Sequence, residues 1–111
     1  MDEDQLDLLF HALASQPRRE MLDLLRQHPG ANVGFVAAHF ELSRIGVMKH
    51  LDVMEAAELI VSERSGRERR LYFNPVPLQW VYERWTDEYS GYWASRLTEL
   101  KRIIETGEAK K

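Results

Sequence analysis

Hydrophobic positions recur at helical spacing through the first third of the chain. Leu6, Leu9, Phe10 and Leu13 form an apolar stripe, which predicts a helix from about Asp4 to Ala14. Ser15 is a suitable N-cap for a second helix, whose core positions are Met21, Leu22, Leu24 and Leu25. The segment His28-Pro29-Gly30 ends this second helix.

Two shorter apolar patterns follow in close succession. Asn32 is a plausible N-cap for a helix with Val33, Val36, Ala37 and Phe40 on one face. After Glu41-Leu42, Ser43 can cap another helix, in which Val47, Leu51 and Met54 recur at i, i+4 and i+7. Two short helices joined by a tight turn predict a helix-turn-helix.

The polar face of the second of these helices carries the candidate base-reading residues. They are Ser43, Arg44, Gly46, Met48 and Lys49, with His50 near the border of the apolar stripe. Arg44 can pair with a guanine, Lys49 can reach a phosphate or a guanine, and Met48 can touch a thymine methyl group. Gly46 could let the backbone approach DNA. For His50, a DNA contact and a local hydrogen bond within the protein both stay open.

An arginine-rich hairpin is predicted next. Leu59–Val61 and Leu71–Phe73 read as strands, and Ser65-Gly66 supplies the turn. Four arginines (Arg64, Arg67, Arg69 and Arg70) surround that turn, opposed by Glu68. Such a tip suits phosphates or the electronegative minor groove. A solvated, charged turn is the alternative, but the position of the arginines directly after a helix-turn-helix pattern favours nucleic-acid binding. For Arg18 and Arg19, at the start of the second helix, a phosphate contact and a solvated or ion-paired helix start both stay open.

The segment from Pro77 to about Glu105 is predicted to form one long helix. Its apolar stripe includes Trp85, Tyr89, Trp93, Leu97, Leu100 and Ile104. Because so small a core cannot cover this stripe, we expect two copies to pack together, joined by the first helix. The alternative is a ligand pocket lined by Trp80, Trp85, Tyr89 and Trp93. Gly91 marks a bend or a close helix contact.

Composition narrows the class of protein. The length of 111 residues fits one domain, and the net charge of −3 is unevenly distributed, since positive charge gathers at Arg64–Arg70. The absence of cysteine excludes disulfides and thiolate metal sites. No signal peptide or membrane-spanning run is evident, so we expect a soluble, cytoplasmic protein. Enzyme activity is not expected, because no nucleophile with a partnered base and no phosphate-binding loop stands out.

The sequence resembles the ArsR/SmtB family of winged-helix transcriptional regulators, in the branch that lacks the metal-site cysteines. The matching segments run from Phe10 to about Ile104 and comprise Ala12-Leu13-Ala14, Arg18–Leu22, Leu42-Ser43-Arg44, Val47 with Lys49-His50-Leu51, and Gly66-Arg67 with Tyr72. The resemblance implies a homodimer that binds operator DNA and usually represses. Two positions depart from the family: Met48 stands where relatives usually have a small polar residue, and Glu58 where they often have glycine.

Metal sensing, which the resemblance also raises, finds little support in the residues. Asn32 and Gly34 occupy the positions of the family's thiol box, and the last helix contains no histidine. Asp7 and His11 share a face and could form part of a zinc site, but such a pair is usually an ordinary surface contact. We therefore expect no metal site and no cofactor.

Together these observations predict a mainly helical winged helix-turn-helix with the element order α-α-α-α-β-β-α. We expect a single domain over residues 1–106, a DNA-binding part at about 32–73, dimerisation through about 3–14 and 77–105, and a disordered tail at 107–111. The expected partners are double-stranded DNA and a second copy of the chain, with no membrane and with the small-molecule effector unknown. The alternatives are an effector- or metal-responsive sensor of the same fold and a winged-helix module that binds protein.

Overall fold

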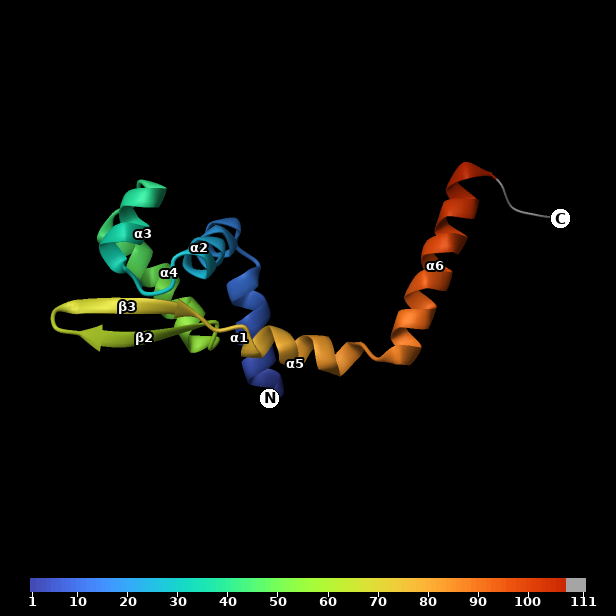
Figure 1. The fold of residues 1–111 in the computed structure, drawn as a ribbon, viewed down its shortest axis with the longest axis horizontal. Coiled ribbons are helices and arrows are strands. Elements are labelled where there is room, and N and C mark those ends of the chain that lie inside the picture. Colours follow the sequence, from blue (N-terminus) through green and yellow to red (C-terminus); the bar gives the residue numbers. More distant parts are fainter. Residues whose placement is uncertain (108–111) are drawn as a thin grey trace. The chain divides into compact units, whose positions relative to one another are not determined.

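A computed structural model describes residues 1–107 of the chain (Figure 1). The elements follow in the order α1 (Glu3–Leu13), α2 (Gln16–Gln27), β1 (Ala31–Asn32), α3 (Val33–Phe40), α4 (Arg44–Ala56), β2 (Ile60–Ser65), β3 (Glu68–Phe73), α5 (Val76–Trp85) and α6 (Glu88–Thr106). The mainly helical, winged helix-turn-helix fold predicted from the sequence is confirmed. The described residues form two compact units, Met1–Pro77 and a second one that begins at Leu78.

Polar side chains begin the helices where the sequence predicts. The Oγ of Ser15 accepts from the backbone N–H of Arg18, Oδ1 of Asn32 from that of Phe35 at 2.8 Å, and Oγ of Ser43 from that of Gly46 at 3.0 Å. These bonds satisfy N–H groups that have no partner inside their own helix. The boundaries of α2, α3 and α4 therefore follow from local sequence.

The small sheet contains a strand that the sequence analysis missed. β1 pairs antiparallel with β3, and β3 pairs with β2, so the strand order is β1-β3-β2. Gly30 has a φ of +85°, a conformation that side chains disfavour, and its N–H donates to the carbonyl of Leu71 at 2.9 Å. A strand of two residues carries no periodic pattern, so only its pairing with β3 reveals it.

The prediction of one long helix from Pro77 to Glu105 is wrong. The structure has two helices, α5 and α6, separated at Thr86-Asp87. Asp87 is extended, with φ −160° and ψ −172°, and its carboxylate accepts from the N–H of Ser90 at 2.7 Å. Asp87 therefore acts as the N-cap of a new helix, and the break lies there rather than at Gly91. Gly107 ends α6 with a φ of +72°, and the rest of the predicted disordered tail falls outside the described residues.

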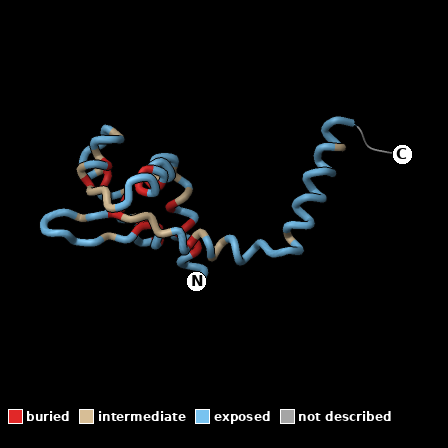
Figure 2. The backbone as a smooth tube through the Cα atoms, in the orientation of Figure 1, coloured by how far each residue is buried: buried red, intermediate tan, exposed pale blue. Residues whose placement is uncertain are grey.

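One hydrophobic core holds the first unit together (Figure 2). Its fully buried side chains come from all four N-terminal helices and from the base of the hairpin, and they include Leu9, Met21, Leu25, Val36, Val47, Leu51, Met54, Leu59, Ile60 and Leu71. The outer half of the β2–β3 hairpin carries exposed residues on both strands. The core thus fixes α4 together with the root of the β2–β3 hairpin, which is the wing of the fold, while the wing tip reaches into solvent.

Candidate nucleic-acid interface

The first two turns of α4 present a mixed cationic and apolar surface. Val47 is fully buried, whereas Arg44, Ile45, Met48 and Lys49 are exposed. Ile45 is 70% exposed and was missed by the sequence analysis, although an isoleucine on the polar face opposite Val47, Leu51 and Met54 was a usable signal. An exposed isoleucine leaves apolar surface in water, which is unfavourable, and adds no packing to the core. Its presence here therefore suits contact with a partner.

Gly46 and Arg44 have local neighbours that the sequence did not reveal. A Cβ at Gly46 would lie 3.2 Å from the Oγ of Ser43, so the missing side chain makes room for the N-cap of α4. A Cβ at Gly34 would lie 3.5 Å from Nη1 of Arg44, which places the Arg44 guanidinium beside the start of α3. Arg44 makes no hydrogen bond or ion pair within the described chain, and its donors remain available.

Arg18 and Arg19 bind the end of α1. Arg18 donates from Nε to the carbonyl of Ala12 and from Nη2 to that of His11, both at 2.9 Å, and Arg19 donates to Leu13 at 2.7 Å. Cations at a helix C-terminus stabilise its last carbonyls and interact favourably with the helix dipole. Nη1 of Arg18 also lies 3.4 Å from Nδ1 of His50, so His50 has the local contact that was one of its two interpretations.

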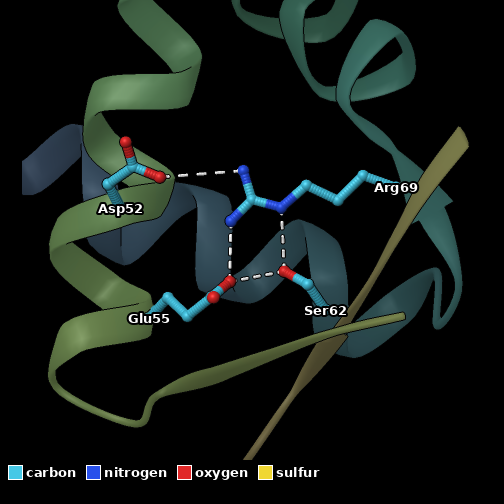
Figure 3. A network of polar contacts seen from close by, with 4 residues as sticks. All are labelled: Asp52, Glu55, Ser62 and Arg69. Atoms are coloured by element: carbon cyan, nitrogen blue, oxygen red, sulfur yellow. Dashed lines mark hydrogen bonds and ion pairs between the residues drawn. The ribbon is translucent and has the colours of Figure 1, made fainter. Parts of the chain in front are cut away.

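The four wing arginines occupy different environments, although the sequence pattern predicted one role for all of them. Arg64 and Arg67 are exposed and make no hydrogen bond or ion pair within the described chain. Arg70 lies on the strand face that also carries Glu68, and its guanidinium is 3.2 Å from the Glu68 carboxylate. Arg69 points the other way, toward α4, and is held by Asp52, Glu55 and Ser62 (Figure 3).

A groove with a volume of about 490 Å³ lies between α4 and the wing. The residues that line it are Val33, Arg44, Met48, Asp52, Glu55, Ser62, Arg64, Arg67 and Arg69. Cationic side chains from α4, the second helix of the helix-turn-helix and hence its recognition helix, and from the wing tip therefore converge on one open groove. Within it, hydrogen bonds from Ser62 and Arg69 hold the pKa of Glu55 below its usual value, so this carboxylate stays charged.

The residues predicted for dimerisation separate into two sets. Leu6 and Leu9 are 5% and 0% exposed, so their assignment to a dimer surface is wrong: they belong to the core of their own unit. Leu13 is half-buried, while Phe10 and the unpredicted Leu8 are exposed on α1. In the second unit, exposed apolar side chains include Trp85, Tyr89, Trp93, Leu97, Leu100 and Ile104, and α6 has no buried residue.

The aromatic side chains of the second unit contact one another along the helix. The rings of Tyr89 and Tyr92 lie 6.0 Å and 5.7 Å from that of Trp93, edge to face. Trp85, Tyr89 and Trp93 are between 41% and 69% exposed, so they form an open surface here. Trp80, the fourth residue of the alternative ligand pocket, is half-buried.

Among residues 1–107, no group of three or more histidine, aspartate or glutamate side chains is placed to hold a metal ion. Asp7 and His11 therefore have no third ligand of this kind beside them in the described part of the chain. No described helix is both long and apolar enough to cross a membrane.

These features define a winged helix-turn-helix DNA-binding protein: a short positioning helix, a recognition helix with an exposed cationic start, and a wing with arginines at its tip. No family model matches the chain. It is 31% identical over 87 residues to an uncharacterized HTH-type transcriptional regulator, YuzN, of Bacillus subtilis (strain 168), across 73% of this chain and 95% of YuzN. It is 32% identical over 71 residues to the transcriptional repressor SdpR of the same organism, across 64% of this chain and 78% of SdpR.

Solved structures similar to this chain are also transcriptional regulators. An ArsR-like transcriptional regulator from Rhodococcus sp. RHA1 matches with a TM-score of 0.70 and 27% identity, over 93% of each chain. A homodimeric winged helix-turn-helix DNA-binding domain from Mycobacterium bovis matches with a TM-score of 0.60 and 20% identity, over 96% of this chain and 83% of that one. The chain belongs to the ArsR family of winged helix-turn-helix transcriptional regulators, and its role is DNA-binding regulation of transcription.

Proposed function

We propose that the protein is a homodimeric repressor that binds an inverted-repeat operator. The observation that carries this proposal is the groove between α4 and the wing, on which Arg44, Arg64 and Arg67 converge without ion-pair partners in the described chain. Unpaired guanidinium groups on two neighbouring elements match two parts of a DNA duplex, the base edges in a major groove and the adjacent phosphates.

In this proposal the start of α4 enters the major groove. Arg44 pairs with a guanine, and the exposed side chains of Ile45 and Met48 contact thymine methyl groups. Lys49 and Ser43 bind phosphate, and the wing arginines Arg64 and Arg67 bind the flanking backbone or minor groove. His50 and Arg70 remain weaker candidates, because each already has a contact within the protein.

The second unit supplies the proposed dimer contact. α6 has 19 residues and no buried side chain, whereas helices in proteins gain most of their stability from packing of an apolar face. Trp93, Leu97, Leu100 and Ile104 recur on one side of it at steps of three and four, which forms a self-complementary stripe that a second copy would cover. The homodimeric state of the Mycobacterium bovis relative supports this arrangement.

Repression and the operator symmetry follow from the dimer. A twofold dimer places two recognition helices about 34 Å apart, one turn of DNA, and so favours an inverted repeat. Occupation of such a site near a promoter excludes polymerase, and the relative SdpR is a transcriptional repressor.

The test is a binding selection on fragmented DNA from the source organism, followed by titration of the best fragment over a series of salt concentrations. We expect a tight complex on an inverted-repeat site, with affinity that falls steeply as salt rises. Equal, weak binding to all fragments would contradict the proposal and favour a winged helix that binds protein.

A further inference from the structure

A cluster of four polar residues, centred on Arg69, connects the wing to the recognition helix (Figure 3). From β3 its Nη2 lies 2.7 Å from the carboxylate of Glu55 and its Nη1 lies 3.7 Å from that of Asp52, both on α4. Its Nε donates to the Oγ of Ser62 on β2 at 2.9 Å, and the Ser62 hydroxyl in turn donates to Glu55. One guanidinium therefore joins three elements.

The environment of Arg69 differs from that of the other wing arginines. Its side chain is 21% exposed, and its planar fork is shared among two carboxylates and a hydroxyl. The strand register places Arg64 directly opposite Arg69, an arrangement that is repulsive unless one of the two charges is balanced. Asp52 and Glu55 balance Arg69, which leaves Arg64 as the cation with donors available for a partner.

The two carboxylates are otherwise difficult to explain at this position. Asp52 and Glu55 line the groove between α4 and the wing, where they would repel the phosphates of bound DNA. The wing strands contribute the buried residues Ile60 and Leu71 to the core. Within residues 1–107, the polar side-chain contacts between these strands and α4 all belong to the Arg69 cluster. A clamp that fixes the wing against α4 accounts for negative charge on a DNA-binding surface.

We propose that Arg69 is a positioning residue, which holds the wing at the distance from α4 that lets both elements contact DNA at once, and that it does not bind phosphate itself. This inference rests on the proposed DNA binding. The wing arginines thus have two roles. Arg64 and Arg67 bind DNA, and Arg69 holds the wing that carries them in position relative to α4. Preorganisation of this kind raises affinity because the wing does not lose conformational freedom on binding.

The substitution Glu55→Gln gives the two interpretations opposite signs. If Arg69 binds phosphate, loss of the carboxylate removes a repulsive charge and frees the guanidinium, so operator binding should tighten. If Arg69 is a clamp, the loss loosens the wing, and binding should weaken by about tenfold. Glu63→Gln is the matched control, because Glu63 lies opposite Arg70 on the other face of the wing and its loss changes the net charge equally. We expect Glu63→Gln to bind as tightly as the wild type or slightly more tightly.

Salt dependence provides the second readout. Arg67→Ala should lower the slope of log affinity against log salt by about 0.9, the value for one lost phosphate contact. Arg69→Ala should weaken binding by about tenfold with an unchanged slope, and Arg69→Lys should recover part of the loss, since one ammonium can still reach one carboxylate. Unfolding curves of each variant establish that the wing substitutions leave the core folded.

The outcomes distinguish the inference from the function on which it rests. A wild-type protein that binds no DNA refutes the proposed function. A wild-type protein that binds its operator, with Glu55→Gln tighter and Arg69→Ala reducing the slope as Arg67→Ala does, refutes the clamp alone.

Discussion

Glu58 occupies a backbone conformation that favours glycine, and its replacement should stabilise the protein. Its φ is +61°, at the turn that joins α4 to β2. The turn is closed by hydrogen bonds from the N–H of Glu58 to Glu55 and from the N–H of Leu59 to Met54, both at 2.9 Å. The side chain of Asn74 also donates to the carbonyl of Glu58 at 2.8 Å. Because the surrounding bonds hold this conformation, the residue cannot relax out of it.

The expected gain follows from three contributions. An L-residue in the left-handed region is destabilised by about 1–2 kcal/mol, which Glu58→Gly would remove. Glycine has more freedom in the unfolded chain, which costs about 0.5–1 kcal/mol. The exposed hydrogen bond from Gln5 to the Glu58 carboxylate, 3.3 Å long, is also lost, at a cost of a few tenths of a kcal/mol. The free energy of unfolding should rise by about 0.5 kcal/mol, which corresponds to a Tm increase of about 2–4 °C.

Denaturant and thermal unfolding at one fixed protein concentration would measure this difference. Glu58→Ala is the control, because alanine loses the same hydrogen bond and keeps the strained backbone. We expect the glycine variant to be more stable than the alanine variant by about 1 kcal/mol. Equal stability of the two variants would refute the assignment of strain to Glu58.

Three other substitutions test the interface, the dimer and the clamp. Arg44→Ala should weaken operator binding by about 1–3 kcal/mol and relax one base position, measured by titration of operator variants; uniform weakening on all sequences would contradict a base contact. Leu97→Lys should shift sedimentation toward monomer, whereas Ser95→Lys, on the opposite side of α6, should not. Hydrogen bonds from Ser62 and Arg69 lower the pKa of Glu55, so its contribution to stability is present above its ordinary pKa of 4.5 and is lost as the pH falls below it. Stability curves against pH should therefore be flatter in this acid range for Glu55→Gln than for the wild type.

Much of the DNA-binding unit could be predicted because its signals are local. Asn32 and Ser43 cap helices through bonds to residues three positions away, and the apolar stripe of α4 turns the same side chains inward in any context. The hairpin was placed correctly for the same reason, although its strands, Ile60–Ser65 and Glu68–Phe73, extend further than the apolar runs suggested.

The errors have a common cause in contacts that are distant in sequence. The apolar stripe of α1 identified a buried face without saying what buries it, and Leu6 and Leu9 proved to be covered by their own unit. The continuous periodicity from Pro77 onward concealed the cap at Asp87, because a periodic pattern does not report a break of two residues.

The sequence by itself determined the order of helices and hairpin, the apolar faces and the cationic character of the wing, since each depends on residues within one or two turns of chain. The roles of the individual wing arginines were decided by the tertiary structure. Arg64, Arg67, Arg69 and Arg70 are chemically identical. Side chains alternate along a strand, and the packing of the hairpin beside α4 decides that the face with Arg69 meets the carboxylates while Arg70 lies on the opposite face. Which arginine is available to DNA thus depends on neighbours that are distant in the chain, such as Asp52, which lies 17 positions before Arg69, and no local pattern encodes these contacts.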